Sequence, residues 1–133
     1  MNILVIDAQG GGIGKQLVTA IKKNIPDSCI TAVGTNTVAT SAMLKAGADK
    51  AATGENAVVV NSRVADVIIG PIGIVIADAM LGEITAKMAN AVAQSIAKRI
   101  LIPVNHCDNI VVGVADLNIT KLIQAVIIEL EKY

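Results

Sequence analysis

Short apolar runs alternate with amphipathic segments along the whole 133-residue chain. Residues 3–6 form the first apolar run; after a glycine stretch, Leu17, Val18 and Ile21 fall at helical spacing before Pro26 ends the pattern. A strand buried on both faces is apolar throughout, whereas a surface helix is apolar along one stripe. The alternation therefore predicts repeated strand–helix units.

The same alternation continues to the C-terminus. Further strands are expected at residues 29–33, 48–52, 67–69, 99–104 and 110–114. Helices are expected at residues 37–46, 85–95 and 119–130. Residues 56–65 suit a strand by propensity, but a parallel crossover there needs about ten residues, which favours a helix.

A helix is also expected over residues 71–80. Pro71 suits the first position of a helix, and Gly82 suits the residue after its end. The apolar face of this helix would consist of Ile72, Val75, Ile76, Ala79 and Met80.

These elements predict an α/β fold over residues 1–133 as a single domain. We expect a Rossmann-like, doubly wound three-layer sandwich, with a mostly parallel sheet of five to six strands and the first strand near its centre. Ligands of such sheets bind at the carboxyl ends of the strands. The loops expected there span residues 7–15, 34–36, 53–56, 70–73 and 105–108.

The first of these loops carries the strongest candidate chemistry. Glycines after a strand bring bare N–H groups against a ligand, and the following helix adds the positive end of its dipole. A phosphate or nucleotide is the expected ligand, although a tight turn that packs closely would also explain the glycines. The expected contacts are Gly10, Gly11, Gly12, Ile13, Gly14 and Lys15.

Three phosphate-loop templates can be compared with this stretch. The fingerprint GxGxxG fails at Lys15. The GxxxGxG variant of short-chain dehydrogenases is more similar, with Ala8 in place of its first glycine, but the YxxxK pair is missing because the sole tyrosine is Tyr133. This likeness implies NAD or NADP as the cofactor. Thr35 and Asn36 would then contact a ribose, where an acidic residue is usual.

The third template is a P-loop. Residues 10–15 are similar to the deviant Walker A motif of MinD-like ATPases, with Lys15 well placed. Gln16 stands where a serine or threonine should hold magnesium. A degenerate P-loop ATPase is therefore the less favoured alternative.

Candidates for catalysis are few. Asp7, Arg63 and His106 lie in or beside the expected loops, but His106 also fits an ordinary loop histidine and Arg63 a salt bridge with Asp66 or Glu55. Gly70 would open the helix expected after it and offer a second anion site. One histidine and two cysteines cannot supply the four ligands of a structural zinc site, so no metal is expected.

Composition narrows the class of partner. Acidic and basic residues number 11 each and are scattered, which argues against nucleic acid. The longest apolar stretch, residues 67–77, is too short to span a membrane, and no export signal is visible, so a cytoplasmic location is expected. Because 53% of the residues are hydrophobic, some apolar surface would remain for a homo-oligomer.

The whole chain resembles a family of short bacterial proteins catalogued as a domain of unknown function. The likeness is carried by AQGGGIGKQ (8–16), GTNTVATSAMLKAGAD (34–49), TGENAVVVNSR (53–63), GPIGI (70–74) and LIPVN (101–105). The resemblance implies a Rossmann-like protein and names no catalytic residues. The expected function is thus nucleotide binding, of the NAD(P) type, with the reaction unassigned; a sensor or regulatory module and a structural oligomer are the alternatives.

Overall fold

The computed structural model describes residues 1–104, 108–114 and 118–133 and contains one parallel sheet. Its strands are β1 (Asn2–Asp7), β2 (Cys29–Gly34), β3 (Lys50–Thr53), β4 (Val67–Pro71) and β5 (Lys98–Ile102). The strands lie in the order β3-β2-β1-β4-β5, and every neighbouring pair is parallel. This order is that of a Rossmann-like doubly wound sheet, and it puts β1 at the centre, as expected.

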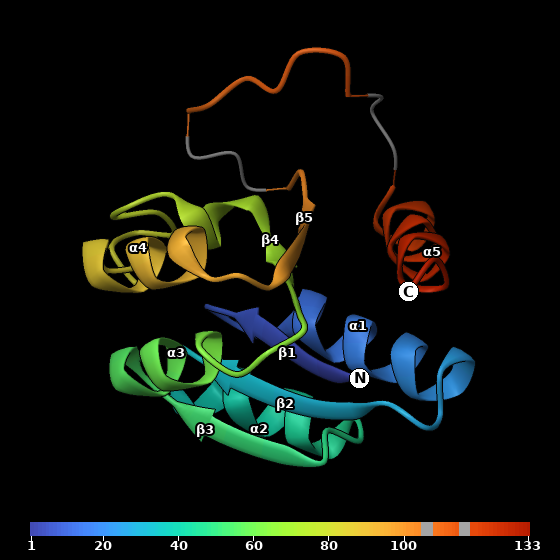
Figure 1. The fold of residues 1–133 in the computed structure, drawn as a ribbon. Coiled ribbons are helices and arrows are strands. Elements are labelled where there is room, and N and C mark those ends of the chain that lie inside the picture. Colours follow the sequence, from blue (N-terminus) through green and yellow to red (C-terminus); the bar gives the residue numbers. More distant parts are fainter. Residues whose placement is uncertain (105–107, 115–117) are drawn as a thin grey trace.

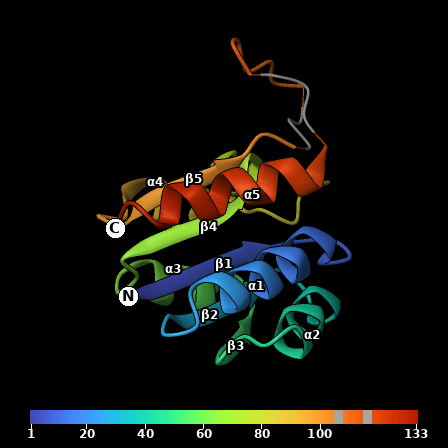
Figure 2. The ribbon, with the colours of Figure 1, turned by 90° about the vertical axis from the view of Figure 1, so that its right-hand side faces the viewer.

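Helices cover both faces of the sheet (Figures 1 and 2). One face carries α1 (Gly12–Asn24), α2 (Thr37–Lys45) and α5 (Ile119–Leu130), whereas the other carries α3 (Glu55–Ser62) and α4 (Ala86–Gln94). The predicted three-layer α/β sandwich is therefore confirmed. The segment 56–65, left open between strand and helix, contains most of α3.

The central strand explains the two-sided core. Ile3 and Val5 enter the hydrophobic cluster under α1, α2 and α5, whereas Leu4 and Ile6 enter the cluster under α3 and α4. All four side chains are 1% exposed or less. Strand β1 is thus buried on both faces, which fixes the position of the glycine stretch at its carboxyl end.

The prediction of a helix over residues 71–80 is wrong. Pro71 is the last residue of β4, and only a short 3₁₀ helix, η1 (Ile72–Val75), follows before the chain turns. Four of the five residues 72–76 are β-branched, which disfavours a helix, and the buried Ile74 is already anchored in the core under α3 and α4.

A sixth strand, predicted at residues 110–114, is also not formed. Ile110 and Val112 are 90% and 92% exposed, and these residues lie in the segment that projects above the sheet in Figure 1. Residues 108–114 therefore add no strand to the sheet. Among the described residues, no helix is long and apolar enough to span a membrane, and no group of three or more candidate side chains is placed to hold a metal ion.

Candidate functional site

The turn between β1 and α1 stands at the carboxyl edge of the sheet. Gln9 and Gly11 both have positive φ, 52° and 74°, and Gly11 N–H donates to Ala8 O over 3.1 Å. Helix α1 begins immediately afterwards at Gly12. The strand–glycine turn–helix unit is therefore confirmed as a structure.

The glycines of this turn divide into two pairs. A Cβ atom at Gly11 would lie 2.7 Å from Ala39 Cα, and one at Gly14 would lie 2.5 Å from Met43 Sδ. By contrast, a Cβ atom at Gly10 or Gly12 would meet no atom within 4 Å. Close packing on α2 thus accounts for Gly11 and Gly14 but not for Gly10 and Gly12.

One of the amides at the start of α1 is occupied by the protein itself. Gly14 N–H donates to Asp7 Oδ2 over 2.6 Å, and Ala8 N–H donates to Asp7 Oδ1 over 2.8 Å. Asp7 is only 4% exposed. Burial raises the pKa of this carboxyl above 3.8, against the lowering effect of the two N–H donors, and nearby Glu83 adds to the rise.

The remaining amides of the turn are open. Gly10, Gly12 and Ile13 have no hydrogen-bond partner for their backbone N–H groups among the residues that the structure describes. Gly10 and Gly12 are exposed, and Ile13 is half-buried. The helix start thus presents unsatisfied donors to solvent beside two glycines that leave the approach clear.

A second carboxylate, that of Glu83 in the segment between η1 and α4, contacts the residues that follow the neighbouring strand β2. Glu83 Oε1 accepts hydrogen bonds from Gln9 N–H (3.0 Å), Thr35 Oγ1 (2.7 Å) and Asn36 Nδ2 (2.8 Å). Burial acts to raise the pKa of Glu83, but these three donors outweigh it and hold the pKa below 4.5. The side chain is therefore ionised at neutral pH.

The segment before Glu83 has an unusual backbone conformation. Asp78, Met80 and Leu81 adopt positive φ of 66°, 55° and 57°, and Asp78 N–H donates to Ile84 O over 2.8 Å. Left-handed backbone at three non-glycine residues is strained and is held here by packing, since Met80 is buried. A pocket of about 510 Å³ lies between this segment and the turn, lined by residues 76–81 together with Gln9 and Asp108.

The ribose contacts predicted for Thr35 and Asn36 stay a prediction, because both side chains bind Glu83 in this structure. Asn36 also caps α2 by accepting from Ala39 N–H and donates to Gln9 O. Sequence reasoning missed Glu83, since Gly82 before it leaves its direction open. Residues 34–36 contain no acid, and only the three-dimensional arrangement shows that Glu83 brings a carboxylate to them.

Other predicted site residues lie apart from the turn. Arg63 follows the end of α3, four residues before β4 begins, so it stands near the amino edge of the sheet and not beside the turn. The expected salt bridge of Arg63 with Asp66 or Glu55 is not formed. Gly70 is buried within β4, where an added Cβ would lie 2.5 Å from Ile6 O, so it opens no helix.

Two further candidates need placing. Lys15 is exposed on the first turn of α1 and lines a groove of about 490 Å³ with Lys45 of α2. His106 lies outside the described residues. The structure therefore brings together the turn, Asp7, Thr35, Asn36 and Glu83.

Comparison with known proteins identifies the family to which the chain belongs. No curated protein matches the chain. Among solved structures, it is similar to a dodecameric FMN-dependent UbiX-like decarboxylase from Escherichia coli O157:H7, at 17% identity and a TM-score of 0.47 over 99% of this chain and 75% of that chain. A family model described as "Domain of unknown function (DUF3842)" matches residues 2–133, so the chain belongs to that family.

Proposed function

We propose that this DUF3842 protein binds a nucleotide whose phosphate rests on the free amides of Gly10, Gly12 and Ile13. The proposal rests on one observation: neither close packing nor backbone conformation explains why residues 10 and 12 are glycines. Gly10 and Gly12 have neither a close neighbour nor positive φ, yet their N–H groups are open at a helix start. A phosphate needs this combination of donors and clear approach.

The finer proposal is an NAD(P)-type dinucleotide. In such sheets an acidic side chain after the second strand accepts from the ribose hydroxyls. Residues 34–36 contain no acid, but Glu83 holds a carboxylate at this place through Thr35 and Asn36. Its other oxygen, Oε2, has no hydrogen-bond partner among the described residues, which leaves an acceptor for a ribose hydroxyl.

The charge of Glu83 supports NAD over NADP. A 2′-phosphate would be placed against an ionised carboxylate, and like charges at contact distance disfavour binding. The rest of the dinucleotide would extend into the pocket lined by Gln9 and residues 76–81.

Binding without turnover is the second candidate, favoured by Asp7. Both oxygens of this carboxylate already accept backbone N–H groups, and the side chain is buried, so it is badly placed to remove a proton from a substrate. A sensor or regulatory module needs only the binding step.

The test is thermal unfolding with NAD, NADH, NADP, NADPH, ATP with magnesium, or inorganic phosphate, because a ligand of the native state raises the midpoint. Gly12→Val places an isopropyl group beside the open amides, and its Cβ atom would meet no other side chain or neighbouring element within 4 Å. Ala86→Val is the matched control, since Ala86 is likewise an exposed first residue of a helix, on α4.

We expect NAD or NADH to raise the midpoint of the wild-type protein and of Ala86→Val but not of Gly12→Val. A rise that survives in Gly12→Val would put the ligand elsewhere. A rise with ATP and magnesium alone would favour the P-loop alternative, and no rise with any ligand would overturn the proposal.

A further inference from the structure

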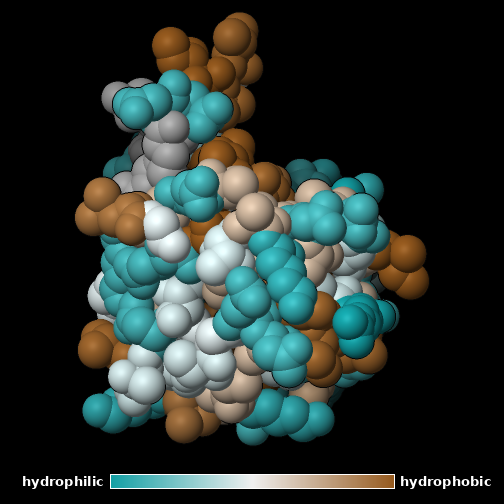
Figure 3. Space-filling view, turned by 90° about the vertical axis from the view of Figure 1, so that its left-hand side faces the viewer, coloured by the Kyte–Doolittle hydropathy of each residue, from teal (hydrophilic) through white to brown (hydrophobic). Residues whose placement is uncertain are grey.

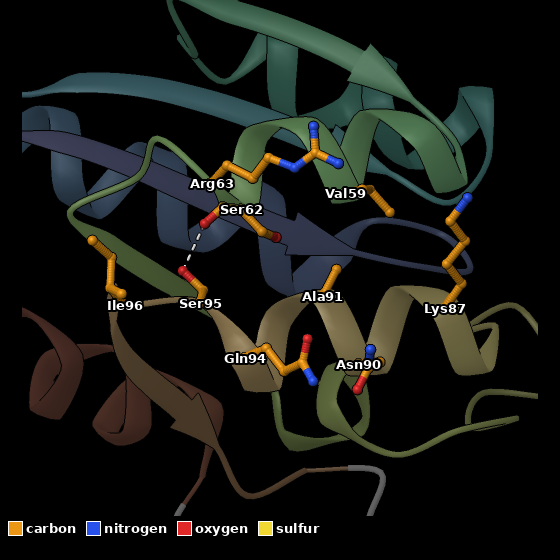
Figure 4. A pocket seen from close by; sticks show the side chains of 9 residues that line it. All are labelled: Val59, Ser62, Arg63, Lys87, Asn90, Ala91, Gln94, Ser95 and Ile96. Atoms are coloured by element: carbon orange, nitrogen blue, oxygen red, sulfur yellow. Dashed lines mark hydrogen bonds between the residues drawn. The ribbon is translucent and has the colours of Figure 1, made fainter.

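A separate groove lies between α3 and α4, on the face of the sheet opposite to α1 (Figure 4). Its volume is about 440 Å³. Figure 3 looks onto this side of the molecule, where hydrophilic side chains are interspersed with small neutral ones. The groove is lined by Val59, Ser62, Arg63, Lys87, Asn90, Ala91, Gln94, Ser95 and Ile96.

Ser62 carries a buried hydroxyl with no partner. The residue is 2% exposed, and its Oγ is the one buried side-chain polar atom without a hydrogen bond in the part of the chain that the structure describes. Its backbone carbonyl, in contrast, accepts from Ser95 Oγ over 2.6 Å. Figure 4 shows the Ser62 side chain directed into the space between the two helices. An unpaired buried hydroxyl is unfavourable, and an acceptor entering the groove would satisfy it.

Apart from Ser95, the other polar side chains of the groove are unpaired among the described residues too. Arg63, Lys87, Asn90 and Gln94 make no side-chain hydrogen bond or ion pair with the described residues. Elsewhere among the described residues, Lys22 pairs with Asp49 at 2.6 Å and Lys132 pairs with Glu129 at 2.8 Å. Five side chains that carry donors, two of them cationic, therefore line one groove without a hydrogen-bond partner among the described residues.

The groove has the charge of an anion site. None of its nine lining residues is acidic. Figure 4 shows Arg63 reaching along α3, Lys87 at the far end of the groove, and the amides of Asn90 and Gln94 along α4. Val59, Ala91 and Ile96 supply apolar contacts between these polar groups. Guanidinium, ammonium and hydroxyl donors together are suited to carboxylate or phosphate oxygens.

We propose that the α3–α4 groove binds a small organic anion, whose carboxylate or phosphate group accepts hydrogen bonds from Ser62 and Arg63. Lys87 adds charge at the other end, and the neutral body of the ligand packs on the aliphatic side chains. This site does not depend on nucleotide binding at the β1–α1 turn, because the two sites share no residue.

The test is titration of the ¹⁵N-labelled full-length protein with two probes, inorganic phosphate and succinate, followed by amide and side-chain NMR shifts. We expect saturable shifts at Ser62, Arg63, Asn90 and Gln94 with at least one probe. The probe that binds more tightly distinguishes a phosphate ligand from a carboxylate ligand.

Two charge variants provide the comparison. Arg63→Gln should weaken binding by roughly tenfold or more, as expected for loss of a charge-assisted contact. Lys121→Gln removes the same charge from the exposed side of α5, across the sheet, and should leave the affinity unchanged. Equal weakening in both variants would show general charge screening and overturn the proposal.

Ser62→Ala separates a ligand role from a structural one. If the hydroxyl awaits a ligand, its removal weakens probe binding and leaves the midpoint of unfolding unchanged or higher. A lower midpoint with unchanged probe binding would overturn the role of Ser62. Shifts that fail to saturate with either probe, or a groove already covered by a second copy of the chain in solution, would overturn the site as a whole.

Discussion

The β1–α1 turn and the α3–α4 groove differ in whether the protein itself provides acceptors for their hydrogen-bond donors. At the turn, carboxylates of the protein itself occupy many of the donors: Asp7 binds Gly14 N–H, and Glu83 binds Gln9, Thr35 and Asn36. In the groove no lining residue is acidic, and five side chains with donors have no partner in the described part of the chain. The protein's own carboxylates therefore hold the donors of the turn in place, whereas the donors of the groove have no carboxylate partner among the described residues.

This difference bears on where negative charge is tolerated. Two internal carboxylates near the turn reduce its attraction for an anion, so a ligand there must use the few free amides and offer hydroxyls to Glu83. The groove has no carboxylate that would repel an anion, and its arginine and lysine side chains attract one. The two regions therefore predict different responses to mutation, pH and ligand.

Gly14→Val should cause the largest loss of stability. Its Cβ would approach Met43 Sδ at 2.5 Å and Asp7 Cβ at 2.9 Å, and overpacking of this kind costs about 3 kcal/mol. Urea unfolding measures the change, with Gly12→Val as the comparison because it meets no atom within 4 Å. Equal losses in both variants would contradict the division of the glycines.

Asp7→Asn should cost about 2 kcal/mol, because an amide nitrogen would replace one of the two oxygens that face backbone N–H groups. The pKa of Asp7 is raised by burial, so its contribution to the free energy of unfolding is present below pH 3.8 and is lost as pH rises through the folded pKa. The deficit of the variant should therefore shrink as pH rises.

Urea unfolding of both proteins across the acid range checks this sign. A deficit that grows with pH would show that the two N–H donors outweigh burial at Asp7.

Glu83→Gln should cost less, about 1 kcal/mol, since the neutral oxygen still accepts from Thr35 and Asn36 but without charge assistance. Here the pKa is lowered, so the contribution of Glu83 is present above pH 4.5 and is lost as pH falls through the folded pKa. The pH trend is thus opposite to that of Asp7.

The same variant should lower the pKa of Asp7, because Glu83 contributes to its rise. Carboxyl carbon NMR shifts across pH measure this directly. An unchanged Asp7 pKa in Glu83→Gln would show that the two carboxylates do not interact.

Sequence patterns predicted the parts of the fold that depend on local periodicity. The apolar run 3–6, the stripe of Leu17, Val18 and Ile21, and the glycines between them define β1, the turn and α1. Residues 71–80 had the same apolar spacing but formed no α-helix. There the β-branched side chains and the buried Ile74 and Met80 decided the structure through packing, which periodicity does not register.

The candidate site was predictable only where its residues follow one another in the chain. The turn is such a segment, whereas Glu83 reaches it across 74 positions from Gln9. Arg63 was expected beside the turn because α3 could not be oriented from its sequence. The groove is lined by residues from the end of α3 and from α4, which are far apart in the sequence. Only the three-dimensional arrangement shows that the Ser62 hydroxyl is buried there without a hydrogen-bond partner among the described residues.

The smallest expected effect compares an unpaired cation with a paired one. Arg63 has no partner within residues 1–104, 108–114 and 118–133, so Arg63→Gln should change the free energy of unfolding by less than about 0.5 kcal/mol. Lys22→Gln should cost up to about 1 kcal/mol, because Lys22 Nζ contacts Asp49 at 2.6 Å and donates to Ser28 O. The contact with Lys22 also holds the pKa of Asp49 below 3.8.

Thermal and urea unfolding at low salt measure both variants, and added salt should remove most of the difference because exposed pairs are screened. If Arg63→Gln were as costly as Lys22→Gln, Arg63 would have an internal partner in solution, and the groove would lose one of the two free cations on which its anion affinity depends.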